Sequence, residues 1–171
     1  MPPVILPPWL VITLDIVLWF VIHMGMSWLA EQIPSRHFEK DVFPYKAYAF
    51  EKSGVFYEKV FLIKTWKKYL PDGAALFKSG FRKKALRTTD PEYLGRFITE
   101  SRRAEAAHLM QIAPVGILFL FNEVWVGWIM VLYAILANLP CIITQRYNRP
   151  RFTRLQKAAE SRNKARRTGL T

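Results

Sequence analysis

Lysine and arginine are absent from the first 35 residues of this 171-residue chain, although the whole sequence carries 25 of them against 13 Asp and Glu. A basic nucleic-acid-binding module of this size is poor in apolar runs, and this chain is not, so no nucleic-acid partner is expected. The single cysteine, Cys141, lies in an apolar run and excludes a disulfide framework. The sequence also lacks a Gly-rich phosphate loop, a Cys/His metal spacing, a Gly-x-Ser-x-Gly elbow and an internal repeat.

Charge and apolarity occupy different segments of the chain. The formal net charge is +12, yet 51% of the residues are hydrophobic and the mean hydropathy is +0.06. Sixteen of the cations lie between Arg36 and Arg103, and the other nine lie between Arg146 and Arg167. A soluble globular domain mixes the two kinds of residue along its whole length. The length allows one domain, and we expect a single membrane domain over residues 1–171.

Three apolar stretches are predicted to cross a bilayer: residues 4–30, 106–121 and 124–143. The first is interrupted only by Asp15 and His23 and is about the length that a membrane core requires. A secretory signal peptide would begin with a cation and end in small residues, so we interpret this stretch as a retained span. A soluble protein with three buried helices would need a larger core than this chain can cover.

The second and third stretches are predicted to form a helical hairpin, since only Asn122 and Glu123 separate them. Residues 91–103 have helical periodicity and are expected to lead into the second stretch as one helix. Loops rich in Lys and Arg stay in the cytoplasm, so the cation count predicts an outer N-terminus and an inner C-terminus. The expected fold class is therefore all-α and integral to the membrane, with three transmembrane helices, in a multi-pass protein of the bacterial cell membrane.

The cytoplasmic segment 31–105 interleaves aromatic residues with cations and is expected to be an interfacial helical segment. Within it, residues 50–70 are predicted to form a helix in the headgroup region that ends at residues 71–73. Its apolar residues recur at helical spacing: Phe56, Val60, Ile63 and Leu70. Asp90 as N-cap and Pro91 in the first turn predict the next helix start. The basic tail, residues 144–171, is expected to contact solvent or lipid.

Glu105 and His108 are the predicted catalytic pair. At a spacing of three they share one helix face, so the carboxylate can hold the imidazole tautomer while the other ring nitrogen takes a proton from a substrate hydroxyl. Arg102 lies one turn earlier on that face. The alternative, which these residues alone favour, is that Arg102 and Glu105 form a surface pair and His108 is an amphipathic residue at the interface. Di-iron bundles need Glu-x-x-His twice, and one copy is present, so no metal site is expected.

Two interpretations are open for three other polar residues in or beside the spans: Asp15, His23 and Asn138. Asp15 and His23 lie on roughly one side of the first span, where they either line one cavity or bond a neighbouring helix. Asn138, beside Pro140, offers an amide near the inner leaflet, with helix packing as the alternative. Gln111 is a further polar residue within the second stretch.

The densest polar string, residues 145–151, directly follows the third stretch. Three Arg, an amide and a phenol at the headgroup level are suited to phosphate, a carboxylate or sugar hydroxyls. The alternative is a stop-transfer anchor on lipid phosphates, for which cations alone suffice. The candidate substrate-binding residues are Arg102, Arg103, Asn138, Gln145, Arg146, Tyr147, Asn148, Arg149 and Arg151.

Several motifs together resemble one known family. They are Ile33-Pro34, Phe50-Glu51-Lys52-Ser53-Gly54, Lys64-Thr65-Trp66-Lys67, Asp72-Gly73, Arg103-Ala104-Glu105-Ala106-Ala107-His108, Ala137-Asn138-Leu139-Pro140 and Gln145 to Arg151. From about Ile33 to Leu155 the chain is similar to the glycosyl-diaponeurosporenoate acyltransferases of bacterial carotenoid synthesis. The resemblance implies a small integral membrane enzyme that esterifies the sugar of a glycosylated carotenoid with a fatty acyl chain, giving a staphyloxanthin-like pigment. It assigns no catalytic residue.

The partners that the resemblance implies fit the distribution of charge. The acceptor, a glycosyl carotenoid or related glycolipid, lives among membrane lipids, whereas the donor, acyl-CoA or acyl carrier protein, is acidic and cytoplasmic. No bound cofactor is expected, and other enzymes of the pigment pathway are further expected partners. Two other classes remain open: a non-catalytic membrane adaptor with a polybasic lipid- or partner-binding face and, ranked last, a small transporter.

Our mechanistic hypothesis places the chemistry on the cytoplasmic side. His108, oriented by Glu105, deprotonates a sugar hydroxyl that attacks the acyl thioester. Donor phosphate or developing oxyanion charge is held by cations and an amide of the polar string: Arg146, Asn148, Arg149 and Arg151.

Overall fold

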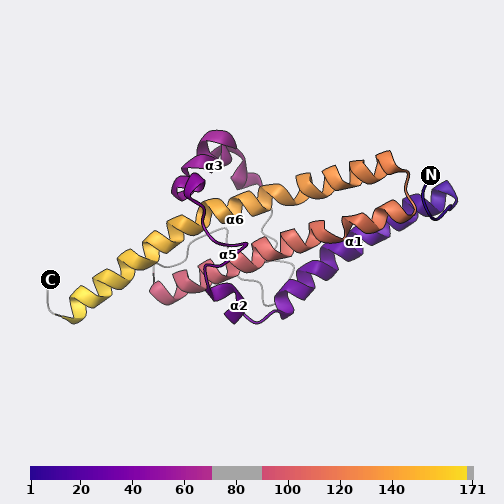
Figure 1. Cartoon of the computed structure of the whole chain (residues 1–171). Coiled ribbons are helices and arrows are strands. Elements are labelled where there is room, and N and C mark those ends of the chain that lie inside the picture. Colours follow the sequence, from indigo (N-terminus) through magenta and orange to yellow (C-terminus); the bar gives the residue numbers. More distant parts are fainter. Residues whose placement is uncertain (71–89, 169–171) are drawn as a thin grey trace. The chain divides into compact units, whose positions relative to one another are not determined.

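The structure, a computed structural model, describes residues 1–70 and 90–168, in which every regular element is a helix and none is a strand (Figure 1). The chain divides into two compact units. We call Met1–Pro34 with Ala104–Ile142 the apolar unit, and Ser35–Arg103 with Ile143–Thr171 the basic unit. All 25 Lys and Arg of the sequence belong to the basic unit and none to the apolar unit. The separation of charge along the sequence is therefore also a separation between compact units.

Two helices of the described residues are long and apolar enough to cross a membrane: α1 (Pro8–Gln32) and α6 (Val124–Arg167). α1 begins at Pro8 rather than at residue 4, and proline is well tolerated in the first helical turn. Only 11% of the most apolar stretch of α1, and 28% of that of α6, is buried inside the protein. Phe20 of α1, for example, is 68% exposed. The core helix of a soluble protein would bury these side chains, so the chain has the features of a membrane protein.

The helix predicted to start at Asp90 is confirmed. α5 spans Pro91–Ile112, and a carboxylate oxygen of Asp90 accepts the backbone N–H groups of Glu92 and Tyr93 at 3.1 and 3.2 Å. The helix does not continue unchanged to residue 121. It gives way to a 3-10 helix, η4 (Ala113–Leu120), whose first turn contains Pro114. Proline lacks the N–H that an α-helix needs at this point, which explains the change.

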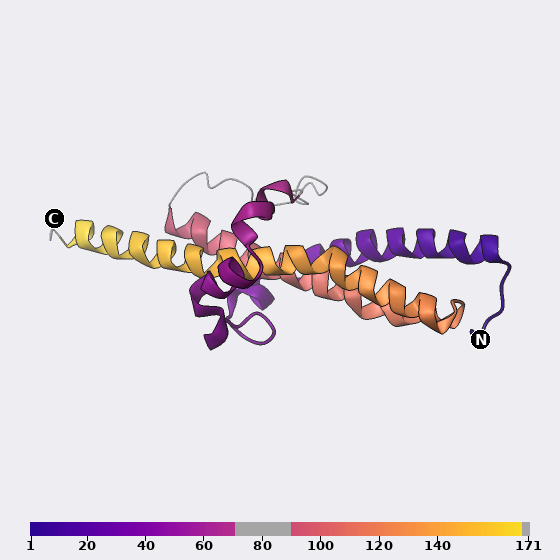
Figure 2. The ribbon, with the colours of Figure 1, turned by 90° about the horizontal axis from the view of Figure 1, so that it is seen from above.

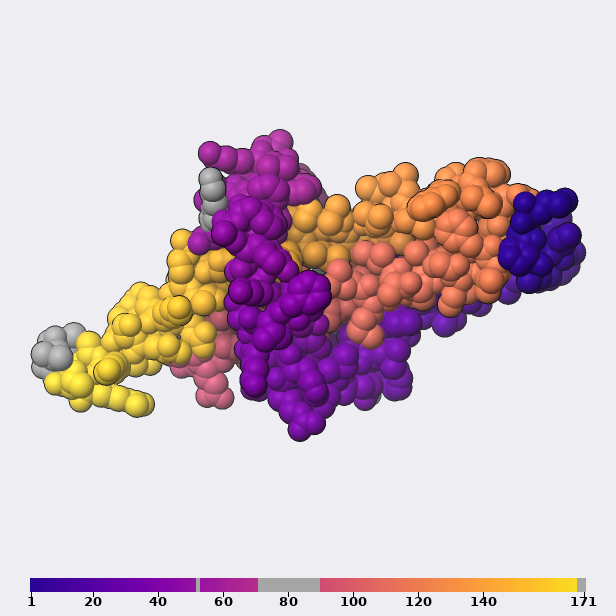
Figure 3. All heavy atoms as spheres, viewed as in Figure 1, coloured from indigo at the N-terminus to yellow at the C-terminus, as the bar shows by residue number. Residues whose placement is uncertain are grey.

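A tight turn between η4 and α6 closes the predicted hairpin, and α6 runs back beside η4 and α5 within the apolar unit (Figures 1 and 2). The turn residue Asn122 is buried and donates from its backbone N–H to Leu118 O at 3.1 Å. The N-terminal residues cover the turn, with Val4 N–H donating to Leu120 O at 2.9 Å (Figure 3, indigo). The position of this turn was therefore predicted correctly from the sequence.

In the basic unit, the first half of α5 packs antiparallel to the second half of α6. Gln156, in the second half of α6, donates from Nε2 to Pro91 O at 3.2 Å. Six residues further along α5, the ring centroids of Phe97 and Phe152 are 4.0 Å apart. The basic tail is helical as far as Arg167, because α6 continues through it without a break.

The single helix predicted over residues 50–70 is wrong. Short elements replace it, and they follow α2 (Arg36–Glu39): η1 (Ala49–Gly54), α3 (Val55–Val60), α4 (Ile63–Trp66) and η2 (Lys67–Tyr69). Breaks fall where the backbone has a positive φ, at Ser53, Gly54 and Leu62. The breaks let Ile63, which is fully buried, pack in a core cluster instead of a lipid-facing stripe; the other buried members are Tyr57, Ile143 and Tyr147. The stop predicted at residues 71–73 lies outside the described residues.

Replacing Gly54 with Ala is expected to destabilise the basic unit. Gly54 has a φ of +99°, and an added Cβ would lie 3.2 Å from Tyr147 O. The left-handed backbone and the close contact together should lower the free energy of unfolding by about 1–3 kcal/mol. Thermal unfolding of the detergent-solubilised protein, followed by circular dichroism, measures the loss.

Gly25→Ala is the matched control for that experiment. Gly25 lies inside α1, and an added Cβ there meets nothing within 4 Å. Because alanine favours a helix over glycine, this variant should unfold at the wild-type temperature or slightly above it. Equal effects of the two substitutions would contradict the role assigned to Gly54.

Candidate functional site

The predicted base His108 lies on α5 within the apolar unit and contacts Asn138 of α6. The ring nitrogen Nδ1 of His108 is 2.9 Å from Oδ1 of Asn138. Asn138 is only 1% exposed, and its Nδ2 donates to Ala134 O one turn earlier at 2.9 Å. The structure therefore brings together two predicted site residues that are 30 positions apart in the sequence.

The contact between these side chains sets the tautomer of the neutral imidazole. A backbone carbonyl only accepts hydrogen bonds, so the amide group that faces Ala134 O must be the NH₂ of Asn138. Oδ1 of Asn138 then faces His108, and Nδ1 of the neutral ring must be the nitrogen that carries the proton. The lone pair is left on Nε2, which is the arrangement that a general base requires.

Glu105, predicted to orient His108, is 1% exposed, and Arg102 is 7% exposed. The alternative of a surface pair between these two residues is therefore wrong, because neither side chain is at the surface. Orientation of the imidazole by the carboxylate stays a prediction.

Asp15 and His23 bond neighbouring segments of the apolar unit. Asp15 accepts from Asn122 Nδ2 at 2.8 Å, in the buried turn of the hairpin. Nδ1 of His23 lies 3.1 Å from Oε1 of Gln111 on α5, and Gln111 Nε2 donates to Ser27 Oγ at 2.8 Å. The interpretation as helix-packing contacts is the one that these bonds favour.

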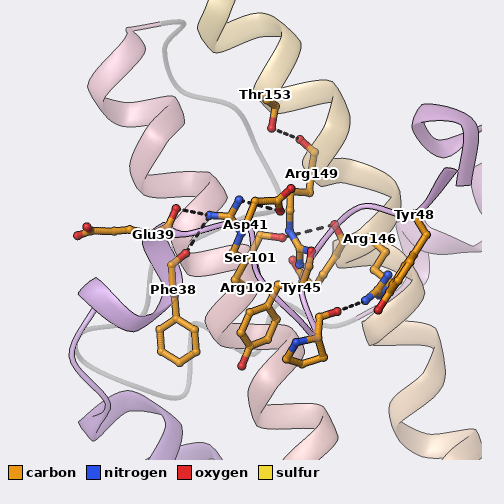
Figure 4. A network of polar contacts seen from close by, with 12 residues as sticks. Phe38, Glu39, Asp41, Tyr45, Tyr48, Ser101, Arg102, Arg146, Arg149 and Thr153 are labelled. Atoms are coloured by element: carbon orange, nitrogen blue, oxygen red, sulfur yellow. Dashed lines mark hydrogen bonds and ion pairs between the residues drawn. The ribbon is translucent and has the colours of Figure 1, made fainter.

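Arg102 belongs to a polar network in the basic unit (Figure 4). Its guanidinium donates to the backbone carbonyls of Phe38 and Glu39 at 2.9 and 2.7 Å and pairs with the Asp41 carboxylate at 3.2 Å. The next residue, Arg103, donates to Ser35 Oγ at 2.7 Å. Both side chains thus hold the segment that follows α1 in the sequence.

Two arginines of the polar string reach the same segment from α6 (Figure 4). Arg149, 6% exposed, donates to Tyr45 O at 2.8 Å. Arg146 donates to Pro44 O and pairs with the buried carboxylate of Glu51. Hydrogen bonds to carbonyls and to one carboxylate offset the cost of burying these cations. Arginines predicted to bind substrate are therefore also scaffold residues of the basic unit.

The rest of the string has a second acidic partner, Glu58. Tyr147 is fully buried, and its hydroxyl donates to Glu58 at 2.9 Å. Arg151 also pairs with Glu58 and lies over the Tyr147 ring, with 4.1 Å between the guanidinium carbon and the ring centroid. The Glu58 pKa is lowered from its ordinary value, first by a hydrogen bond from Lys64 and then by the Tyr147 hydroxyl. The backbone carbonyl of Gln145 accepts from Ser101 at 3.4 Å.

Sequence reasoning missed the two glutamates that organise the string. Glu51 lies in the Phe-Glu-Lys-Ser-Gly motif that carried the family resemblance, so the motif was a usable indication. It accepts from the Tyr57 hydroxyl at 2.7 Å, and burial is the first cause, this bond the second, of the raised Tyr57 pKa. Glu58 had no such indication. Among residues 1–70 and 90–168, no group of three His, Cys, Asp or Glu could hold a metal ion.

Comparisons with known proteins agree on one family. Residues 41–158 match the sequence profile described as glycosyl-4,4'-diaponeurosporenoate acyltransferase. A protein of that name from Staphylococcus aureus strain N315 is 35% identical over 144 residues, covering 84% of this chain and 87% of the relative. The protein of that name from strain Newman is 36% identical over 137 residues, or 80% of this chain and 82% of its own. No solved structure matches the chain.

Proposed function

The chain belongs to the glycosyl-4,4'-diaponeurosporenoate acyltransferase family and is an acyltransferase of carotenoid biosynthesis, and on this premise we propose its substrates, its base and its orientation. The acceptor is a sugar hydroxyl of a glycosylated carotenoid, and the donor is a fatty acyl thioester from the cytoplasm. As an enzyme, it is not the non-catalytic adaptor that the sequence alone left open.

The contact between His108 and Asn138 is the observation that carries the proposed chemistry. Asn138 fixes the tautomer, so Nε2 of His108 takes the proton of the sugar hydroxyl as its oxygen attacks the acyl carbon. A carbon–oxygen ester bond forms, the carbon–sulfur bond breaks, and the imidazolium returns the proton to the departing thiolate. Glu105 stabilises the imidazolium, in keeping with its burial three residues earlier on α5.

We propose three spans with an outer N-terminus and an inner C-terminus. The second would be residues 106–121, which rise about 1.5 Å each in α5 and about 2 Å each in η4. Together they cover about 27 Å, close to the roughly 30 Å thickness of a bilayer core. The absence of Lys and Arg from the apolar unit supports the same assignment.

Purified protein in detergent should convert a glycosylated carotenoid and an acyl-CoA into an ester, detected by mass spectrometry as a gain of one acyl chain. In membrane vesicles, external acyl-CoA should be consumed by inside-out vesicles and spared by right-side-out ones, because the proposed site faces the cytoplasm. Absence of ester with every acyl thioester supplied would refute the proposed substrates. Consumption only by right-side-out vesicles would refute the orientation.

A further inference from the structure

Two cations lie over one buried aromatic ring in the basic unit. Nζ of Lys67, in η2, is 4.7 Å from the centroid of the Tyr147 ring, and the guanidinium carbon of Arg151 is 4.1 Å from it. Tyr147 itself is fully buried and fixed by its bond to Glu58. The ring therefore holds two like charges near each other in a defined place.

The cluster around this ring has more positive than negative charge. Its one carboxylate, Glu58, accepts from Lys64 at 2.7 Å, from Tyr147 at 2.9 Å and from Arg151. Lys64 and Arg151 thus share a single anion among the residues described, and Lys67 is a third cation within its field. Burial is the first cause of the lowered Lys67 pKa, and the charge of Arg151 lowers it further. A bound anion would offset both costs.

The cluster also has donors directed outside the protein. The side chains of Lys64 and Arg151 are 61% and 38% exposed. Arg151 donates to Glu58 and interacts with the Tyr147 hydroxyl, and its exposed part still presents N–H groups to the outside. Asn148 accepts from Lys67 at 3.5 Å through Oδ1, so its NH₂ remains a neutral donor. By contrast, Arg102 and Arg149 are more than nine-tenths buried.

We infer that Lys67, Arg151 and Asn148, with Lys64 beside them, form a binding site for a phosphate group of the acyl donor. This inference rests on the proposed function, which supplies a phosphorylated thioester as donor. A guanidinium fork binds two phosphate oxygens, and an ammonium adds a compact point charge. Phosphate also occurs in lipid headgroups, but anchoring to lipid needs only cations, whereas this site adds a positioned amide and a fixed ring.

Binding of free CoA to the full-length protein in detergent, measured by calorimetry, tests the site directly. Lys67→Met should weaken CoA binding about tenfold, since it removes one charged hydrogen bond. Lys67→Arg should restore most of the affinity. Pantetheine, which has no phosphate, should bind both proteins alike. In acyl transfer, Lys67→Met should raise KM for acyl-CoA by a similar factor with kcat little changed.

Lys68→Met is the matched control, because Lys68 is the next residue, is exposed and lies over Tyr69 instead. It removes the same charge and should leave CoA binding unchanged. Equal CoA affinities of wild type and Lys67→Met would overturn the inference, even if ester is formed. Loss of binding to vesicles of anionic lipid, with CoA affinity unchanged, would assign the site to a headgroup and also overturn it. Weakened CoA binding without any ester formation would support the phosphate site and refute the proposed substrates.

Discussion

His108→Ala is expected to lower kcat for acyl transfer by about two to four orders of magnitude, the usual contribution of a general base. The sugar hydroxyl is a weak nucleophile, and the variant lacks the imidazole that would accept its proton. The bond from Nδ1 to Asn138 keeps the lone pair on Nε2. The substitution deletes the ring and this nitrogen with it. Initial rates of ester formation with saturating acyl-CoA, measured by mass spectrometry on purified protein, test this expectation.

Two further variants separate chemistry from structure. Asn138→Leu keeps the imidazole but removes the acceptor that fixes its tautomer, so its rate should fall between those of wild type and His108→Ala. His37→Ala removes an exposed histidine of the basic unit and should retain the wild-type rate. A folded His108→Ala protein with near-normal turnover would refute the assignment of His108 as the base.

Local patterns predicted the parts of the fold that depend on local chemistry. Asp90 and Pro91 identified the start of α5 because capping is set by residues within one turn. Asn122 and Glu123 identified the hairpin because two polar residues between long apolar runs leave room only for a tight turn. Both predictions depended on neighbouring residues alone.

The broken segment between residues 50 and 70 shows where periodicity fails. The apolar spacing there fits one helix, yet Leu62 and Gly54 have a positive φ, and Ile63 packs against Ile143 of α6. A contact over 80 residues of sequence decided the local backbone, and no window of the sequence contains both partners. Periodicity alone therefore favoured an amphipathic surface helix.

The contacts that the candidate site residues make were harder to predict from the sequence than the elements that carry them. Spacing of three pointed to Glu105 as the partner of His108, whereas the contact that fixes Nδ1 comes from Asn138 on another helix. The arginines were recognised as a group, but the bonds that bury Arg102 and Arg149 go to backbone carbonyls. Every residue has a carbonyl, so a sequence gives no indication of which ones an arginine binds.

Glu51→Ala is expected to destabilise the basic unit by about 3–5 kcal/mol, because it leaves the charge of Arg146 without its carboxylate in a buried place. Glu51 is 3% exposed and also accepts from the Tyr57 hydroxyl at 2.7 Å and the Tyr48 backbone N–H at 3.3 Å. Thermal unfolding in detergent, followed by circular dichroism, should show the largest shift among single substitutions in this unit.

Two variants separate the causes of that loss of stability, and a third is the control. Tyr57→Phe removes one neutral donor from the carboxylate and should cost about 1 kcal/mol, whereas Glu51→Gln keeps an acceptor but loses the charge and should lie between Tyr57→Phe and Glu51→Ala. Glu160→Ala removes an exposed carboxylate from α6 and should change stability by less than about 0.5 kcal/mol. If Glu51→Ala were no more destabilising than Glu160→Ala, Arg146 would not depend on Glu51, and the pair could not be what holds residues 44–51 to α6.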